Sequence, residues 1–486
     1  MRILKKILIA LVIILLLGAA LVWWLLQGEP ATISLQETEG TDPTLVEPDP
    51  QTVPTVEIAE PIGWAEGEAP IPGEGLQVNR FAEGLDHPRV IYAMPNGDIL
   101  VTQARAPSTE VAGGWLTNFV ASILFSEAGS SGPSPNQLIL LRDTDGDGTS
   151  DERHVLREDD LDSPSGIAWT DGQLYIANHD EILRFAYEEG ANEITGEPEQ
   201  LAELPAAGNH WMRNLLLSEN GESLFVAVGS ASNIGEGGME AEDARAAIHE
   251  LYLETGVARV FGSGLRNPNG MAWNPWTGEL WTTVNERDML GSDLVPDYIT
   301  NVPIGVHYGW PWFYYGNRID ERVQGVYGIN PAYVRRPEYA LGAHVAPLGF
   351  VFTEEGARMG SAFGNGVFVA RHGSWNRLPA SGYDVVFVAF GDRGSPTGAT
   401  VPVLTGFLTG EGQTRGRPTW VEWDRTGALL VSDDTGNIIW RVTAPDSEPA
   451  AAIQRNTGER LPPQRELNGD PARAFDEGAI RPEDIL

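Results

Sequence analysis

Residues 417–434 read RPTWVEWDRTGALLVSDD: a proline, a short apolar run, a turn with glycine, and a second apolar run that ends in two aspartates. Two such runs around a glycine turn are typical of a β-hairpin. Apolar residues occupy successive positions rather than strictly alternate ones, which indicates strands that are buried on both faces. The stretch therefore predicts two inner strands of a sheet that has neighbours on each side.

The same pattern recurs along the chain. Comparable stretches begin at His87, Ser163, Trp211, Asn267 and Ala346. Self-similar units indicate a repeat fold, and six hairpins with doubly buried strands favour a β-propeller, in which every blade lies between two others. The sequence thus predicts an all-β, six-bladed propeller over residues 73–444, with long insertions between some of the copies.

The first residues predict a membrane anchor. Lys5 and Lys6 precede an apolar run at residues 7–26, which is long enough to cross a hydrocarbon core as one helix. Basic residues before this run, with Trp23 and Trp24 near its far end, place the N-terminus in the cytoplasm and the body outside. We expect a single-pass protein of a bacterial inner membrane with a periplasmic body. A cleaved signal peptide is the alternative.

Two polar segments flank the predicted propeller. Residues 28–72, which follow the anchor of residues 1–27, are rich in acidic residues, proline and threonine and predict a disordered, self-repelling linker. Residues 445–486 have a similar composition and are expected to form a C-terminal tail. An apolar run at residues 115–125 has helical spacing and predicts a short helix, which either caps the propeller or lies on a membrane surface.

The charge of the chain restricts its partners. It carries 68 acidic and 32 basic side chains, a net charge of −36, and its two lysines both precede the predicted span. Nucleic acid needs a basic face, so it is excluded as a partner, and anionic lipid is disfavoured. The chain has no cysteine, which excludes disulfides, thiolate metal sites and a lipoprotein anchor. Because both lysines precede the predicted span, the propeller contains arginines but no lysine.

An acidic loop lies in the first repeat. The run DTDGDGTSD contains Asp143, Asp145, Asp147 and Asp151, with glycine where a calcium-binding loop turns sharply. The position that normally supplies a bidentate glutamate is His154. We expect a structural Ca²⁺ site at the edge of a blade, and a solvated acidic turn is the alternative.

One histidine and several arginines stand near the ends of the predicted hairpins. His210 directly precedes the third repeat, in a loop near the axis, where a base could meet a substrate. Arginines occupy corresponding hairpin ends in other repeats, at Arg266, Arg377, Arg415 and Arg417. Converging guanidinium groups suit a ligand with several carboxylates. The alternatives are a histidine that hydrogen-bonds locally and arginines that cap loop carbonyls.

Six short motifs carry a family resemblance. They read GLRNPNG at 264–270, NERD at 285–288, YGWP at 308–311, HVAPLG at 344–349, HGSWNR at 372–377 and SDDTGN at 432–437. Together they resemble the soluble quinoprotein glucose dehydrogenases and the related sorbosone dehydrogenases, over about residues 75–444, and they are closer to the sorbosone branch. The resemblance implies a propeller that binds pyrroloquinoline quinone (PQQ) and Ca²⁺ over its axis.

The resemblance also implies roles for individual residues. His210 matches the base that removes a hydroxyl proton from the substrate while hydride passes to the quinone. The backbone carbonyls of Glu286 and Arg287 match the ligands of the catalytic Ca²⁺, which polarises the quinone.

Further residues match the family's contacts with the cofactor. Those expected at the quinone or its carboxylates are Arg266, Asn267, Arg415, Arg417 and Asp433. The glucose branch places a lysine on the quinone, and the propeller has none, so Arg377 is the expected replacement.

The leading interpretation is the oxidation of a sugar or a related alcohol or aldehyde, with electrons passed to a membrane or periplasmic acceptor. Two other interpretations stay open. A propeller hydrolase of lactonase type would bring several carboxylate or asparagine side chains to an axial metal. A cofactor-free binding propeller would show no convergence of His210 with the arginines.

Overall fold

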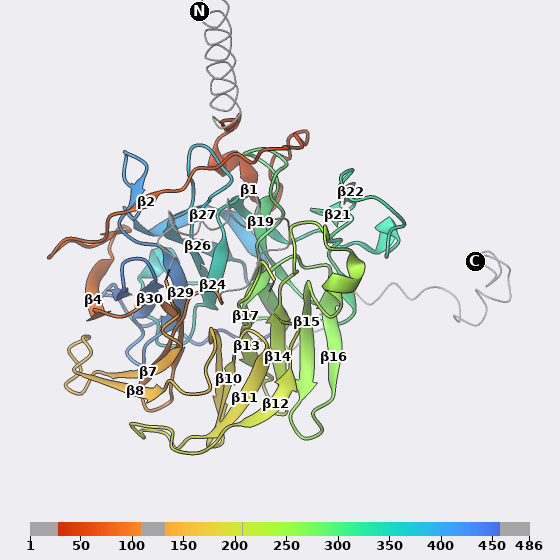
Figure 1. Cartoon of the computed structure of the whole chain (residues 1–486). Coiled ribbons are helices and arrows are strands. Elements are labelled where there is room, and N and C mark those ends of the chain that lie inside the picture. The colour runs from red at the N-terminus through yellow and green to blue at the C-terminus, as the bar shows by residue number, and fades with distance from the viewer. Residues whose placement is uncertain (1–27, 108–131, 207, 457–486) are drawn as a thin grey trace, which may run out of the picture.

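The computed structural model describes residues 28–107, 132–206 and 208–456 (Figure 1). In these ranges six sheets of four or five strands are arranged around a common axis. The prediction of an all-β, six-bladed propeller is therefore confirmed. No helix in the described ranges is long and apolar enough to cross a membrane. The predicted span at residues 7–26 and the apolar run at residues 115–125 lie outside them.

The first three blades are consecutive in sequence. Blade 1 consists of β5 (Pro88–Ala93), β6 (Ile99–Gln103), β7 (Gln137–Arg142) and β8 (Glu152–Arg157). Blade 2 consists of β9 (Gly166–Thr170), β10 (Gln173–Ala177), β11 (Glu181–Ala186) and β12 (Glu199–Glu203). Blade 3 consists of β13 (Leu215–Leu217), β14 (Ser223–Val228), β15 (Ala247–Tyr252) and β16 (Ala258–Ser263), with β20 (Val306–His307) at its edge.

The other three blades each gain a strand from the first part of the chain: β1 (Glu39–Gly40) joins blade 4, β3 (Ile71–Pro72) joins blade 5, and β4 (Gln77–Glu83) joins blade 6. Blade 4 consists of β17 (Pro268–Trp273), β18 (Leu280–Val284), β19 (Pro296–Asn301) and β23 (Tyr339–Ala343). Blade 5 consists of β24 (Pro347–Phe352), β25 (Gly366–Arg371), β26 (Asp384–Phe390) and β27 (Pro396–Thr405). Blade 6 consists of β29 (Pro418–Trp423), β30 (Leu429–Asp433), β31 (Ile438–Thr443) and β4 (Gln77–Glu83).

Short elements fill the insertions between strands. They are the hairpin of β21 (Phe313–Tyr314) and β22 (Arg318–Ile319), β28 (Gln413–Thr414), and the 3₁₀ helices η2 (Met239–Glu242), η3 (Pro331–Tyr333) and η4 (Ser361–Phe363).

The blades close into a ring. The innermost strands contact one another in the order β5, β9, β13, β17, β24, β29 and again β5. β4 pairs with β31, so the first long strand of the described chain completes the last blade. All residues of β6 and β14 are buried, as inner strands between two neighbouring blades must be. Ring closure leaves only short, protected sheet edges.

The two ends of the ring differ in chemistry. The inner strands all begin at one end, and the strand that pairs with each of them finishes there because the pairs are antiparallel. Buried polar residues gather at these positions, among them His87, Asn178, Ser230, Asn267 and Arg417. We call this the polar end. We call the opposite end, with the turns that join these strand pairs, the tail end.

The segment of residues 28–72 is not the disordered linker that its composition predicts. It contains η1 (Leu35–Thr38), β1 (Glu39–Gly40), β2 (Glu60–Pro61) and β3 (Ile71–Pro72), and these strands pair with β23, β28 and β27. Its acidic residues find basic partners on the propeller: the Glu39 carboxylate lies 2.6 Å from the guanidinium of buried Arg371. We call this segment the N-terminal strap.

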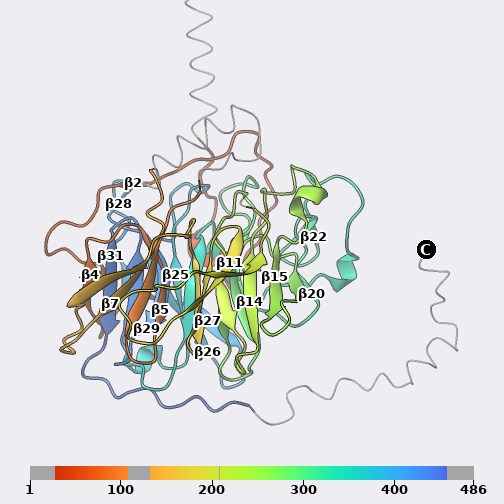
Figure 2. The same ribbon diagram turned by 60° about the horizontal axis from the view of Figure 1, so that its bottom comes forward.

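The strap and the end of the described chain lie at opposite ends of the ring. Figure 2 shows the strap crossing one end, while residues 445–456 run along the other. Backbone hydrogen bonds join Ala450 to Gly356 at 2.9 Å and to Ala357 at 2.8 Å. The described part of the predicted tail is therefore packed against the tail end, and residues 457–486 lie outside the described ranges.

Candidate active site

His210 lies at the polar end, where the sequence predicts it, and its orientation is fixed. Nδ1 of His210 is 2.8 Å from the carbonyl oxygen of Ser230. A carbonyl can only accept, so Nδ1 carries the proton and the neutral ring presents the lone pair of Nε2. Nε2 makes no hydrogen bond with the described part of the chain. The ring is therefore held with its basic nitrogen free.

The surroundings of His210 keep its ring neutral. Burial and the nearby Arg266 guanidinium lower the pKa of His210 to about 3. A ring with such a pKa is unprotonated at any pH near neutrality, which is the state that a general base requires.

Gly229 allows the close approach of two site residues. It follows β14, and a Cβ atom at this position would lie 2.5 Å from Oδ1 of Asn267 and 2.6 Å from Cβ of His210. Both distances are shorter than any ordinary carbon contact. The absent side chain of Gly229 is therefore what lets blades 3 and 4 bring His210 and Asn267 together.

Arg266 lies beside His210, and its guanidinium is fully engaged by the protein. It donates to the Glu286 carbonyl at 2.6 Å and to the Asn233 carbonyl at 3.1 Å, and it pairs with the Asp288 carboxylate at 2.8 Å. Asp288 also faces Nδ1 of His344 at 3.5 Å. Arg266 thus holds the loop after β18 in place beside His210.

Ion pairing shifts the pKa values of Asp288, in this loop, and of His344, which faces it. Burial alone would raise the pKa of the Asp288 carboxyl, but Arg266 and His344 hold it below its ordinary value. Burial alone would lower the pKa of His344, but its contact with Asp288 raises that pKa above the ordinary value for histidine.

Glu286 and Arg287, whose backbone carbonyls the resemblance assigns to Ca²⁺, lie in the same loop. The Glu286 carbonyl already accepts from Arg266, and a carbonyl oxygen has two lone pairs, so one remains for a cation. The buried Arg287 side chain points away and donates to the carbonyls of Pro311 at 2.7 Å and Phe313 at 2.6 Å. It fixes the shape of the loop from behind.

A second cluster at the polar end was not predicted. The carboxylate of Asp434 accepts from Nε2 of His372 at 2.9 Å, pairs with Arg89, and lies 3.5 Å from Nε2 of His87. These side chains come from blades 1, 5 and 6. We call them the Asp434 group.

The Asp434 group is joined to the His210 loop. Arg89 also lies against the sulfur of Met212, at 2.8 Å, two residues beyond His210. Burial lowers the pKa of both His87 and His372 to about 4, so both rings are neutral near pH 7. In spite of burial, the charges and hydrogen bonds around Asp434 hold its pKa well below the ordinary value.

Arg417 and Asp433 lie behind this group. The Arg417 guanidinium donates to the His372 carbonyl at 3.1 Å and lies over the ring of Tyr383. Asp433 accepts from the Arg417 backbone at 2.8 Å and from the indole of Trp64 at 2.8 Å, and burial raises its pKa to about 6. Asp433 therefore shapes the loop, while its neighbour Asp434 faces the axial cluster.

Arg377 and Arg415 make other contacts. Arg377 pairs with Asp293 at 3.1 Å and reaches the strap carbonyl of Ile33 at 3.3 Å. Arg415 is partly exposed, pairs with Glu68 at 3.3 Å, and lies over the ring of Trp64. Neither of them contacts the residues of the His210 loop or the Asp434 group, so the expected convergence of all the arginines is only partial.

The acidic loop between β7 and β8 brings three of its four aspartates together. Ligand oxygens of Asp143, Asp145 and Asp151 all lie within 4.8 Å of one another, while Asp147 is not part of this group. Backbone amides already bond to them, for example Gly146 to Asp143 at 2.7 Å. The loop stands at the edge of blade 1, away from the axis, and its structural Ca²⁺ stays a prediction.

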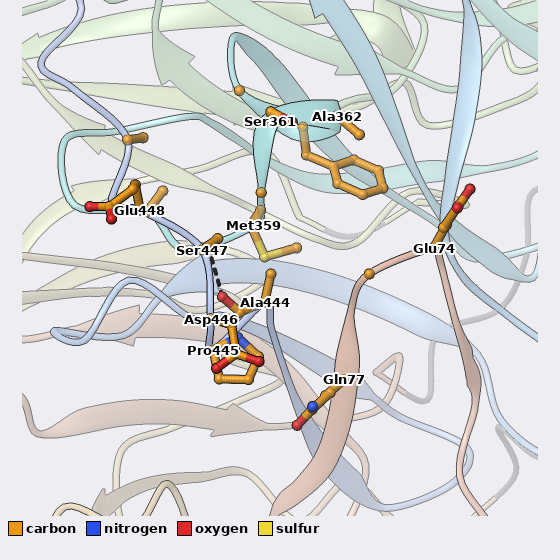
Figure 3. A pocket seen from close by; sticks show the side chains of 16 residues that line it. Glu74, Gln77, Met359, Ser361, Ala362, Ala444, Pro445, Asp446, Ser447 and Glu448 are labelled. Carbon is orange, nitrogen blue, oxygen red and sulfur yellow. Dashed lines mark hydrogen bonds between the residues drawn. The ribbon is translucent and has the colours of Figure 1, made fainter.

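Two cavities in the described part of the chain lie away from these clusters. One, of about 610 Å³, lies at the tail end between blades 5 and 6, and Gln77, Met359, Asp446 and Glu448 are among the residues that line it (Figure 3). Another, of about 760 Å³, lies between the strap and the loop that carries Arg415. The catalytic candidates lie instead among the polar side chains near the axis, where blades 1, 3, 4, 5 and 6 all contribute residues.

Sequence reasoning missed the Asp434 group although a signal for it existed. His87 and Arg89 begin the first repeat, and His372 and Asp434 follow second strands of later repeats. In a propeller all these positions meet at one end, so the repeat register alone could have assembled them.

The chain resembles known proteins in both sequence and structure. A family model described as TrAA12-like matches residues 136–302 and 330–444. An uncharacterized protein of Borreliella burgdorferi is 29% identical over 295 residues, which cover 58% of this chain and 76% of that protein. A pyrroloquinoline quinone-dependent sugar dehydrogenase of Hypocrea jecorina is 23% identical over 427 residues, 76% of this chain and 88% of that enzyme.

The fold has solved counterparts. The holo form of the pyranose dehydrogenase PQQ domain from Coprinopsis cinerea superposes with a TM-score of 0.60 at 20% identity, and the match covers 79% of this chain and all of that domain, 100%. The expected resemblance to quinoprotein sugar dehydrogenases is confirmed. The placement nearer the sorbosone branch stays a prediction.

Proposed function

Because the chain belongs to the TrAA12-like family, we propose that it is a PQQ-dependent dehydrogenase that oxidises a sugar or a related alcohol or aldehyde at the polar end of its propeller. The name of the Hypocrea jecorina relative supports the cofactor. The single observation that carries the proposal is the neutral His210, whose Nδ1 is bound to the Ser230 carbonyl and whose Nε2 bonds to no other described residue.

The residues at the polar end suit a flat, anionic cofactor. Arg89 and Arg417 supply cationic side chains beside the axis: Arg89 shares the Asp434 carboxylate with His372, and the Arg417 guanidinium donates to the His372 carbonyl. Within the described ranges, buried polar atoms without a hydrogen-bond partner include Nε of Arg89, Oδ1 of Asn285 and Oγ of Ser163. Buried polar atoms normally have partners, so these atoms point to a bound polar group. We propose that Arg89, Arg417 and Asn267 hold the quinone.

The protein's part in the reaction is positioning and proton transfer. The quinone, when bound, supplies an acceptor for hydride from the substrate carbon. Nε2 of His210 takes the hydroxyl proton of the substrate as the carbonyl forms, and Ser230 keeps the ring in the required tautomer throughout. The carbonyls of Glu286 and Arg287 are the proposed ligands of a Ca²⁺ ion, which would act as a Lewis acid.

The anchor predicted from residues 7–26 leads us to propose a location at the bacterial inner membrane, with the propeller in the periplasm. A dehydrogenase there passes its electrons to a membrane or periplasmic acceptor. A lactonase-type hydrolase receives less support, because in the described ranges no three acidic or histidine side chains of the polar end bring their ligand atoms within 4.8 Å of one another.

The proposal is tested by adding PQQ and Ca²⁺ to the purified protein and following dye reduction with a panel of aldoses, aldehydes and polyols. We expect reduction that depends on the quinone and on one class of substrate. The absence of both quinone binding and quinone-dependent reduction would rule the proposal out.

A further inference from the structure

The strap is pinned to the polar end from its first described residues. The amide of Glu29 donates to the Thr55 hydroxyl at 2.9 Å, and the Glu29 carbonyl accepts from Ser292 at 2.6 Å. Two residues later, the amide of Ala31 donates to the Leu378 carbonyl at 2.6 Å. Ser292 follows β18 and Leu378 follows β25, so both belong to loops of the polar end.

Further bonds hold the same stretch of the strap. The amide and the hydroxyl of Thr32 both donate to the Asp293 carboxylate, at 2.5 and 2.8 Å, and Asp293 in turn pairs with buried Arg377. Two loops from two blades thus fix residues 29–32. Such a set of backbone and charged contacts does not allow this segment to swing freely.

These contacts continue to the candidate active site. The Thr55 carbonyl accepts from the amide of Asn376 at 2.7 Å, and Oδ1 of Asn376 accepts from the Met289 backbone at 2.8 Å. Met289 adjoins Asp288, which pairs with Arg266 beside His210. The start of the strap and the catalytic loop therefore belong to one connected hydrogen-bonded structure.

This packing shortens the tether between the predicted span and the propeller. A disordered linker over residues 28–72 would give a root-mean-square reach on the order of 40 Å and let the propeller tumble. Because Glu29 is already fixed, only Gln27 and Gly28 separate the apolar run at residues 7–26 from the folded body. Three extended peptide units reach about 10 Å at most.

We propose that the polar end of the propeller, with the candidate active site, faces a lipid bilayer and is held against it by the strap. This inference rests on the membrane location given above, and it names the surface that the site faces. Acidic residues of the strap, such as Glu37, Asp42 and Asp49, give this end no charge attraction to anionic lipid. The short tether, and not surface charge, sets the orientation.

The orientation can be measured by energy transfer in the full-length protein, which has no cysteine of its own. Single cysteines are introduced by Thr52→Cys in the strap at the polar end and by Thr255→Cys in the turn after β15 at the tail end. Both threonines are exposed. Each variant is labelled with a donor dye and placed in phosphatidylcholine nanodiscs that carry a headgroup acceptor dye, without quinone.

We expect several-fold greater transfer from the Thr52→Cys label, since a six-residue strand alone separates the two ends by about 20 Å. Equal transfer from the two labels, greater transfer from Thr255→Cys, or a chain that does not incorporate into nanodiscs would overturn the proposal. A spacer of about 20 glycine and serine residues inserted after Gln27 should bring the two transfers close together. Unchanged transfer in that variant would contradict the tether as the cause.

The measurement is independent of the proposed activity. It contains no quinone and no substrate, and neither label touches His210. If the protein has the expected orientation but shows no quinone-dependent reduction, only the proposed function is contradicted. If it is active but the two labels give equal transfer, only the proposed orientation is contradicted.

Discussion

The carbonyl oxygen of Ser230 lies 2.8 Å from Nδ1 of His210. This contact decides which ring nitrogen can act, because a proton on Nδ1 leaves Nε2 as the base. Ser230 follows Gly229 at the end of β14, so the tautomer of a residue in the loop before blade 3 is set by the second strand of the same blade. The consequences of this arrangement can be measured.

The pH dependence of activity should be flat near neutrality. Burial and Arg266 lower the pKa of His210 to about 3, so the ring stays unprotonated as pH falls from 8 to 5. An unperturbed histidine would lose half of its basic form near pH 6.5. We expect kcat/KM with a saturating dye to show no midpoint between pH 6 and 7. A drop centred there would contradict the environment described for His210.

Gly229→Ala should damage the site. The new Cβ would lie 2.5 Å from Oδ1 of Asn267 and 2.6 Å from Cβ of His210, so one of them must move. Overpacking of this kind costs typically 1–3 kcal/mol, and we expect a fall in the melting temperature together with loss of quinone binding. Gly196→Ala is the matched control, because no atom lies within 4 Å of the Cβ position there. Equal behaviour of the two variants would show that the close approach is unimportant.

Arg417→Ala and Arg377→Ala should differ in what they lose. Arg417 lies beside His372 at the polar end, and its removal should weaken quinone binding, as isothermal titration would show. Arg377 neutralises Asp293, which holds Thr32, so its removal leaves a buried carboxylate unpaired and should loosen the strap. For Arg377→Ala we expect faster proteolysis within residues 28–72 and little change in quinone affinity. If Arg377→Ala instead weakens quinone binding and leaves proteolysis of residues 28–72 unchanged, the result would support Arg377 as the replacement for the missing lysine.

Glu422→Gln should stabilise the propeller at high pH. Burial raises the pKa of this carboxyl in β29 to about 8, whereas in the unfolded chain it is near 4.3. Between these values the folded state holds a proton that the unfolded state lacks, so the stability that this group contributes falls as pH rises. We expect the variant to match the wild type near pH 4 and to exceed it in free energy of unfolding near pH 8. A gap that does not grow with pH would refute the raised pKa.

The sequence predicts the propeller well because its repeat is strong. Each hairpin, such as the one at residues 417–434, has strands that can be buried only between two blades, so the fold class followed without any structure. The same register places His210 and Arg266 near the axis, and in the structure the Arg266 guanidinium lies close enough to lower the pKa of His210.

The misses share a physical cause, which is that composition does not report long-range partners. The strap reads as a linker because residues 28–72 contain no basic residue to pair with their acidic ones, yet Glu39 pairs with Arg371 more than three hundred residues away. Arg377 and Arg415 occupy the expected hairpin ends, but their side chains pair with Asp293 and Glu68 and do not contact the His210 loop or the Asp434 group. No spacing along the chain reveals such pairings.

The proposed function requires that the polar end binds a quinone and that His210 takes the proton of the substrate. The most direct test is a single turnover of quinone-loaded protein mixed with an active sugar, comparing wild type with His210→Gln by the absorbance of the bound quinone. We predict similar quinone affinity and reduction at least about 100-fold slower in the variant, the size of effect expected for loss of a general base. Failure of the wild type to bind the quinone, or equal rates in the two proteins, would contradict the account.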